Sequence, residues 1–232
     1  MFYSHGSYPE KTTAQDFMYK VYGWMSVALT ITASVAYYVF KTPAIFNALQ
    51  TNPSLLMMLM VLQFGLVIAL SFFLQKMTLM VAGISFMAYA VSVGISVSSV
   101  FFIYTQGSVY TTFLTTAGMF GVMSLYGYTT RSDLTSFGSM GIMMLFGLII
   151  GGLVNMFFQN PLVHFFLSAL GVIVFTLLTA YDTQKIKQLG GQLMVDRQTQ
   201  MKIAIIGALA LYLDFINLFL YLLRFMGQRR KN

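Results

Sequence analysis

The sequence contains no cysteine and very few histidine or charged side chains. Cysteine is absent from all 232 residues, which excludes disulfides, thiolate catalysis and cysteine-ligated zinc. The two histidines, His5 and His164, are too far apart in sequence to indicate a metal site. Only 8% of the residues are charged, whereas a soluble domain has about 25%. A chain with so little charge is not expected to fold as a water-soluble protein.

Apolar residues are abundant and are arranged in long runs. They make up 58% of the chain, and the mean hydropathy is +0.77. Each run is long enough to cross a bilayer as a helix, which takes about 20 residues, and too long for a barrel strand. The runs cover residues 21–40, 55–74, 79–102, 109–128, 139–158, 162–181 and 202–225. The sequence therefore predicts an all-α integral membrane protein with seven transmembrane helices, embedded in a lipid bilayer.

Polar stretches between the runs divide the chain into predicted parts. Two of them are expected to be long loops, residues 41–54 with two prolines and residues 182–201. We see no internal repeat and predict one seven-helix domain between two polar ends. The parts are a cytoplasmic N-terminal segment over 1–20, the transmembrane domain over 21–225 and a basic tail over 226–232.

Basic residues predict the orientation of the helices. The net charge of +7 does not indicate nucleic-acid binding, because the basic residues flank the apolar runs. The side that holds the N-terminus receives eight lysines and arginines, so the N-terminus is expected in the cytoplasm. The other side receives Lys41 and the basic residues of the tail. The last run therefore either crosses against this rule or enters the membrane and returns, and the sequence leaves both alternatives open.

The last run, residues 202–225, carries a small and polar face. Its members follow one another at steps of three and four residues, so they share one side of a helix. They are Gly207, Ala210, Asp214, Asn217 and Tyr221. A charge at the bilayer centre costs about 2.5–3.5 kcal/mol even on the lenient insertion scale, so Asp214 should have a partner, water or an ion. A second acid, Asp182, ends the preceding run and is expected near the cytoplasmic mouth of the bundle.

These two acids are the candidate functional residues. If they lie close together, we expect them to share one proton and to titrate as a coupled pair. The shared proton would join the sixth and seventh helices, and its loss would leave two negative charges that repel each other or admit a cation. Calcium takes about 6–8 oxygen ligands and two carboxylates supply at most four, so Thr179, Thr183 and Asn217 are candidate further ligands. Such a sparse set predicts weak, transient binding, which a leak path requires.

Three segments together carry a specific pattern. They are AGMFGVMSLYGYTTRSDLTSFG (117–138), GVIVFTLLTAYDTQKIK (171–187) and ALYLDFINLFLYLLRFMG (210–227). The chain resembles the bacterial branch of the Bax inhibitor family over most of its length, starting at Tyr22-Gly23-Trp24. The resemblance implies six helices around a central C-terminal helix and the activity of a pH-sensitive calcium leak channel. It also implies that Asp182 and Asp214 form the pH sensor and pore lock.

The sequence departs from this family pattern at the end of the second run. Some relatives carry a basic residue there that holds one of the acids, whereas this chain reads FFLQK over residues 72–76, without arginine. Lys76 is the one candidate latch cation in this stretch. Because lysine lacks the bidentate fork of arginine, we expect at most a weak latch.

Two other classes of function deserve comparison with a channel. An enzyme finds no support, because HExxH, GxSxG and phosphate-binding glycine loops are absent, and Asp214 lacks the neighbouring glycine of intramembrane aspartyl proteases. We therefore expect no cofactor, and calcium is expected only as a permeant ion. The protein is expected in the inner membrane of a bacterium. The alternative is a non-transporting membrane interaction protein that regulates other membrane proteins or stress responses. In it, Asp214 would be structural hydrogen-bond glue and Asp182 a helix-end acid beside Lys185.

Overall fold

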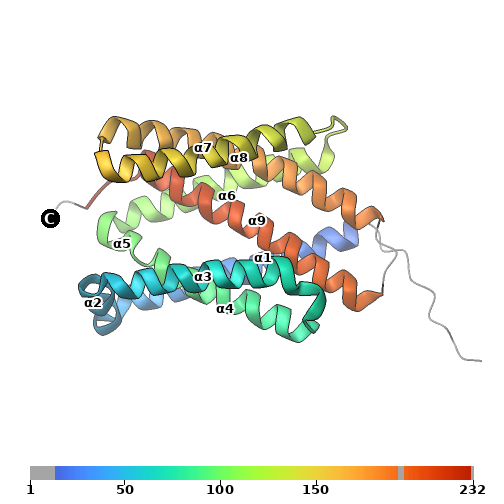
Figure 1. The fold of residues 1–232 in the computed structure, drawn as a ribbon, viewed down its shortest axis with the longest axis horizontal. Helices are drawn as coiled ribbons and strands as arrows, with labels where there is room; N and C mark the ends of the chain where they lie inside the picture. Colours follow the sequence, from blue (N-terminus) through green and yellow to red (C-terminus); the bar gives the residue numbers. More distant parts are fainter. Residues whose placement is uncertain (1–13, 193–195, 231–232) are drawn as a thin grey trace, which may run out of the picture.

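A computed structural model of the chain describes residues 14–192 and 196–230, which are almost wholly helical (Figure 1). Within these residues the one β-type pairing is an isolated bridge between Tyr104 and Arg229. The helices are α1 (Ala14–Lys41), α2 (Pro43–Thr51), α3 (Pro53–Phe73), the 3-10 helix η1 (Leu74–Lys76), α4 (Leu79–Val97), α5 (Val100–Ile103), α6 (Gln106–Thr129), α7 (Thr135–Phe158), α8 (Pro161–Gln192) and α9 (Arg197–Met226). The prediction of an all-α protein is confirmed.

Six helical segments of the described chain are long and apolar enough to cross a membrane. They are α1, α3 with η1, α4 with α5, α7, α8 and α9. The predicted fourth span corresponds to α6, which is 24 residues long but rich in serine, threonine, glycine and tyrosine. Six of the seven predicted spans are therefore supported by both length and composition.

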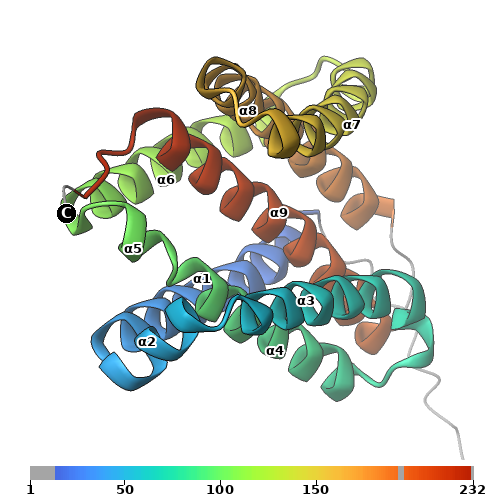
Figure 2. The same cartoon turned by 60° about the vertical axis from the view of Figure 1, so that its left-hand side comes forward.

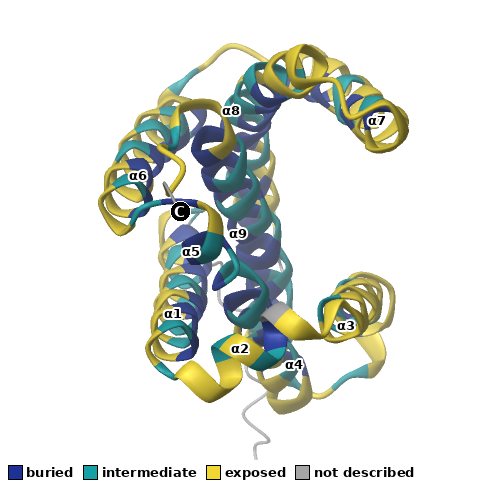
Figure 3. Cartoon of the chain, turned by 90° about the vertical axis from the view of Figure 1, so that its left-hand side faces the viewer, coloured by how far each residue is buried: buried dark blue, intermediate teal, exposed yellow. Residues whose placement is uncertain are grey.

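Helix α9 occupies the inside of the bundle. It runs diagonally between the α7–α8 pair and a group formed by α1, α3 and α4 (Figures 1 and 2). It packs against α1, α4, α6 and α8, whereas α3 packs mainly on α4, and α7 on α8 (Figure 3). Its apolar window is more buried than that of any other candidate span. The interior position of α9 is clear, but the prediction that six helices surround it is not confirmed.

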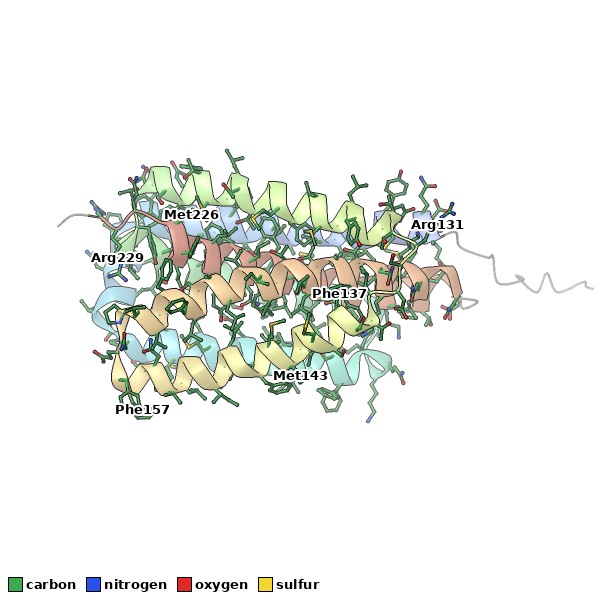
Figure 4. The ribbon with its side chains drawn as sticks, turned by 90° about the horizontal axis from the view of Figure 1, so that it is seen from above. Arg131, Phe137, Met143, Phe157, Met226 and Arg229 are labelled. Carbon is green, nitrogen blue, oxygen red and sulfur yellow. The ribbon has the colours of Figure 1, made fainter. Side chains whose placement is uncertain are left out.

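The path of α9 decides between the two alternatives for the last run. The helix has 30 residues, which corresponds to about 45 Å, and it is continuous from one end of the bundle to the other. The start of α1 and Arg131 lie at one end, while Met226 and Arg229 lie at the opposite end (Figures 1 and 4). The last run therefore traverses the bundle, and the alternative in which it returns without crossing is wrong.

The loop predicted over residues 182–201 is mostly helix. Helix α8 continues to Gln192, and α9 already begins at Arg197, with Asp196 as its N-cap. The polar residues after Asp182 misled the prediction, although Thr183 and Gln184 among them face protein rather than water. Thr183, Ile186 and Gly190 are buried at helical spacing on the extended part of α8. Asp182 thus lies ten residues, or about 15 Å, before the end of its helix.

Two smaller boundaries also differ from the prediction. The loop expected over 41–54 contains α2, because Pro43 and Pro53 stand at the first positions of α2 and α3, where proline starts helices. The third run is interrupted after α4, where the hydroxyls of Ser98 and Ser99 donate to the carbonyls of Ile95 and Ser96. Of the N-terminal segment predicted over 1–20, residues 1–13 lie outside the described residues. The rest of it belongs to α1, which begins at Ala14.

Glycines let α6 and α7 approach α8 closely. A methyl group at Gly127 of α6 would overlap the carbonyl oxygen of Ala180, and one at Gly141 of α7 would lie 2.8 Å from the Leu178 side chain. These close approaches place Ala180 and Leu178, just before Asp182, in firm contact with both neighbours. The position of Asp182 therefore depends on small residues in the helices that pack on α8.

We expect Gly127→Ala to lower the free energy of unfolding by about 1–3 kcal/mol, because the new methyl group meets backbone that cannot turn away. Gly121→Ala is the matched control on the same helix, since nothing lies within 4 Å of its added carbon. It should be neutral or stabilise by about 0.5–1 kcal/mol through helix propensity. Thermal unfolding in detergent measures both variants, and equal melting temperatures would contradict the packing described here.

Candidate functional site

The polar face of α9 lies along α8, as the sequence predicts. The two helices are antiparallel neighbours, and three levels of contact define their register. Near one end, Gly207 faces Ile186, and near the other end the ring of Tyr221 stacks on Phe175 with 5.6 Å between centroids. Asp214 lies midway between Gly207 and Tyr221, seven residues from each. At this level of the bundle its side chain is next to that of Asp182 on α8. The two candidate acids therefore meet inside the bundle.

The side chains of Asp182 and Asp214 are close enough for a hydrogen bond between their carboxyl groups. Two ionised carboxylates have acceptors only, so this bond exists when one of the pair carries a proton. Without that proton, Asp214 Oδ2 is buried and has no other donor within reach. Asp214 is only 5% exposed, so ionising both acids places two close charges where water does not solvate the inner one. The arrangement makes the contact between α8 and α9 sensitive to a single proton.

Lys185, rather than Lys76, is the cation near this pair. Its positive charge acts on Asp182 from one turn further along α8, and its ammonium lies 5.6 Å from the centre of the Tyr181 ring. Lys76 is exposed at the end of η1, where its ammonium lies 5.9 Å from the Phe73 ring centre. The structure therefore does not bring the candidate latch residue to the acids.

The position of η1 explains this separation. The carbonyl oxygen of Met77, next to Lys76, accepts a hydrogen bond of 3.0 Å from the Lys202 ammonium. Lys202 precedes Asp214 by twelve residues, or about 18 Å along α9. Lys76 therefore lies at the level of the first turns of α9, well away from the level of the acids.

A chain of hydroxyl groups lies next to Asp182. The Tyr22 hydroxyl of α1 hydrogen-bonds to Ser124 of α6, and Ser124 Oγ lies 3.1 Å from Thr183 Oγ1 of α8. Thr183 follows Asp182 directly and is fully buried. The chain links three helices at the level of the acids. The sequence does not predict this role for Tyr22 and Ser124, because nothing in their spacing connects residues more than 100 positions apart.

The candidate calcium ligands around the acids already have partners. Thr179 Oγ1 donates to the Phe175 carbonyl over 2.7 Å, as is usual for a threonine inside a helix. Asn217 Nδ2 donates to the Leu213 carbonyl over 2.8 Å. Thr183 is held by Ser124. Among the described residues, no third aspartate, glutamate, histidine or cysteine joins the two acids in a group suited to a metal ion. The hydroxyl proton of Thr179 and the amide proton of Asn217 are thus used within their own helices, and Thr183 is tied to Ser124.

Two cavities lie at different levels of the bundle, one along α9 and one between α8 and the α6–α7 connection. A large cavity of about 1030 Å³ runs along α9 from Leu213 to Arg224, between α3, α4, α7 and α8. Leu213 and Asn217, which flank Asp214 on its helix, line the inner end of this cavity. A smaller cavity of about 360 Å³ near the opposite end is lined by residues that include Gln184 and Lys187 of α8. Asp182 and Asp214 line neither cavity and lie between them along the bundle.

The smaller cavity is bounded by a loop that α8 holds in place. The Gln184 side chain donates to the Ser132 carbonyl over 2.8 Å and accepts from the Leu134 backbone amide over 2.9 Å. The Lys187 ammonium donates to the Tyr128 carbonyl over 2.6 Å. These contacts fix the connection between α6 and α7 against the extended part of α8. A movement of α8 would therefore move the wall of this cavity.

Asp133 and Asp196 lie outside the membrane-spanning segments, and each accepts hydrogen bonds from a threonine two or three residues later. Hydrogen bonds from the hydroxyl and backbone amide of Thr135 hold the pKa of Asp133 below its usual value. The Thr199 amide and hydroxyl lower the pKa of Asp196 in the same way. Because both pKa values are depressed in the fold, the stability that these caps add is present at neutral pH and is lost only on acidification. They therefore serve as reference acids for the pair.

Comparison with known proteins gives consistent relatives. The profile of the family described as "Inhibitor of apoptosis-promoting Bax1" matches residues 14–231. The Escherichia coli K12 protein named "Inner membrane protein YbhL" is 48% identical over 217 residues, covering 93% of each chain. An uncharacterized protein of Borreliella burgdorferi is 48% identical over 216 residues, again covering 93% of each chain. An uncharacterized protein of Deinococcus radiodurans is 39% identical over 222 residues.

A double-mutant cycle with Asp182→Ala and Asp214→Ala should reveal the shared proton. At pH 5 the hydrogen bond should appear as a stabilising coupling in the usual range of about 0.5–3 kcal/mol between contacting residues. At pH 9 the coupling should shrink or become repulsive, because both acids are then charged. Thermal or denaturant unfolding in detergent at the two pH values measures it.

The reference cycle pairs Asp196→Ala with Asp214→Ala. These residues are 18 positions, or about 27 Å, apart on α9, so their effects should add within about 0.5 kcal/mol at both pH values. A coupling between Asp182 and Asp214 that does not change from pH 5 to pH 9 would rule out a proton-dependent contact.

Proposed function

This chain belongs to the Bax inhibitor family, and we propose that it is a pH-sensitive, calcium-permeable leak gated by Asp182 and Asp214. It is an all-helical integral membrane protein of the bacterial inner membrane. The family and the membrane location do not by themselves assign ion conduction. The support for conduction comes from the geometry around the two acids.

The observation that carries the proposal is the position of the acid pair between two cavities. The larger cavity ends beside Leu213 and Asn217, and the smaller one reaches Gln184, two residues beyond Asp182. We infer that a path between the two ends of the bundle would be closed at the level where the carboxyl groups of α8 and α9 meet. A non-transporting protein that uses the acids as structural glue has no need of cavities on both sides of them.

The proposed gate opens when the pair loses its proton. With one proton, the hydrogen bond holds α8 against α9 and the path is closed. With none, the two charges repel each other, and Asp214 Oδ2 has no hydrogen-bond donor. The charges are then relieved by separation of the helices, by water or by a cation entering between them. Calcium flux is therefore expected to rise as pH rises.

Calcium is proposed as a passing ion and not as a bound cofactor. The pair supplies at most four carboxylate oxygens, and water and backbone carbonyls would complete the usual 6–8 ligands. Asn217 is placed to offer its amide oxygen from the wall of the large cavity, whereas Thr179 and Thr183 are occupied by helix and interhelical contacts. Weak binding of this kind allows an ion to leave as readily as it enters.

The topology that accompanies this function has seven spans. We assign α6 as the additional span, because α8 and α9 pack against it and it connects opposite ends of the bundle. The end that holds Arg131, Lys187 and Lys202 is assigned to the cytoplasm by the excess of basic residues there. Asp182, ten residues from the end of α8, would then be the acid of the pair nearer to cytoplasmic protons.

Calcium entry into dye-loaded proteoliposomes between pH 5 and pH 8 tests the gate. Wild-type flux should rise with pH. Asp182→Asn and Asp214→Asn should abolish most of this dependence, because an asparagine amide donates the interhelical hydrogen bond at every pH. Asp196→Asn, which removes an acid from the start of α9, should leave the pH response intact.

Two results would contradict the proposal. A pH response that survives in both asparagine variants would show that another group senses the proton. An absence of flux above empty liposomes at every pH would exclude a leak and would favour a non-transporting interaction protein, in which the same acids only fasten α8 to α9.

A further inference from the structure

The large cavity has a charge pattern that a cation path does not explain. Its wall includes Arg224, Arg229 and His164, and no aspartate or glutamate. The acids in the described part of the chain are Asp16 and Asp133, Asp182, Asp196 and Asp214, and none of them lines this cavity. The outer end of the cavity is therefore basic and has no acid of its own, which favours an anionic occupant.

The same cavity is lined in part by apolar side chains. Met60 of α3, Leu148 and Met156 of α7 and Leu167 of α8 contribute to it. Helices α3 and α7 stand apart on one side of α9, and neither packs extensively on the other in the described chain (Figure 3). The cavity lies in this space. Since α3 and α7 are the least buried candidate spans, this side of the bundle is the one most open to lipid.

The basic end of the cavity is held in place by the tail after α9. The Arg230 amide donates to the Ile103 carbonyl over 2.8 Å, and the Gln228 carbonyl accepts from the Thr105 amide over 3.1 Å. Gly227 permits this approach, because a methyl group there would lie 2.7 Å from the Tyr104 ring. These bonds carry Arg229 to the rim of the cavity, at the end of the bundle opposite Arg131 (Figure 4).

We propose that this cavity binds an anionic phospholipid of the bilayer, with the phosphate at Arg224 and Arg229 and an acyl chain between α3 and α7. Arginine suits this role because its fork binds phosphate oxygens in pairs. The guanidinium of Arg224 lies 5.5 Å from the Tyr221 ring centre, a stacking contact that leaves its edge free for an anion. A free anion would use the basic end alone, so the long apolar wall favours a lipid.

The proposed lipid also accounts for the basic tail. Positive charge at this end of the bundle opposes the usual distribution around transmembrane helices. A phosphate bound at Arg224 and Arg229 would neutralise it. The same cavity forms the outer part of the calcium path proposed above, so a bound acyl chain would compete with conduction. That consequence depends on the proposed function, whereas lipid binding itself does not.

Lipid retention measured by native mass spectrometry tests the site without any flux measurement. Purified wild-type protein is exchanged into detergent with phosphatidylglycerol or phosphatidylcholine, and we expect selective retention of one phosphatidylglycerol. The double variant Arg224→Gln/Arg229→Gln should lose about 30-fold in retention, from the usual contribution of two basic residues to anionic-lipid binding. The control Lys41→Gln/Arg230→Gln removes the same charge from residues that do not line the cavity and should retain the lipid.

A second pair of variants tests the acyl-chain wall. Gly152 lines the cavity and Gly147 does not, and nothing lies within 4 Å of a carbon added at either position. Both glycine-to-leucine variants should therefore fold, yet only Gly152→Leu should displace phosphatidylglycerol. The proposal would be overturned if Arg224→Gln/Arg229→Gln retained as much phosphatidylglycerol as Lys41→Gln/Arg230→Gln. Equal binding of phosphatidylglycerol and phosphatidylcholine by the wild type would also overturn it. Binding of inorganic phosphate without any retention of phosphatidylglycerol would identify a free-anion site and would also overturn it.

Discussion

The contact between Asp182 and Asp214 sets a chemical constraint inside the bundle, because two ionised carboxylates have no hydrogen to share and a bond between them needs a proton. It joins α8 to α9, the helix with the most buried apolar window of the candidate spans. The pair lies where water cannot solvate both charges, so the contact has two distinct states that differ by one proton. A stable apolar contact at this position would hold the same helices together without any response to pH.

The surrounding structure serves to place these two side chains at one level. Gly127 and Gly141 allow α6 and α7 to press against α8 just before Asp182, and Gly207 allows α9 to lie close beside it. The Tyr22–Ser124–Thr183 hydroxyl chain ties α1 and α6 to the same level of α8. Small residues and hydrogen bonds thus fix the register of five helices. The helices α3 and α7 are the least buried candidate spans and border the large cavity.

Much of this arrangement is predictable from the sequence, but not the parts that depend on packing. Hydropathy predicts the long helices, and the spacing of Gly207, Asp214 and Tyr221 predicts that this face of α9 meets protein. The polar run after Asp182 predicts a loop, yet it forms helix because Thr183, Ile186 and Gly190 are buried. Ser124 gives no signal at all in the sequence, since its role depends on α1 and α8 lying beside it.

Infrared difference spectroscopy between pH 5 and pH 8 tests most directly whether Asp182 and Asp214 share a proton. The account predicts a protonated-carboxyl band that is present at acid pH, disappears as pH rises, and is altered by either Asp182→Asn or Asp214→Asn. Asp196→Asn should leave this band unchanged. A spectrum with no protonated carboxyl at pH 5, or a band that neither substitution in the pair affects, would contradict a gate made of these two acids.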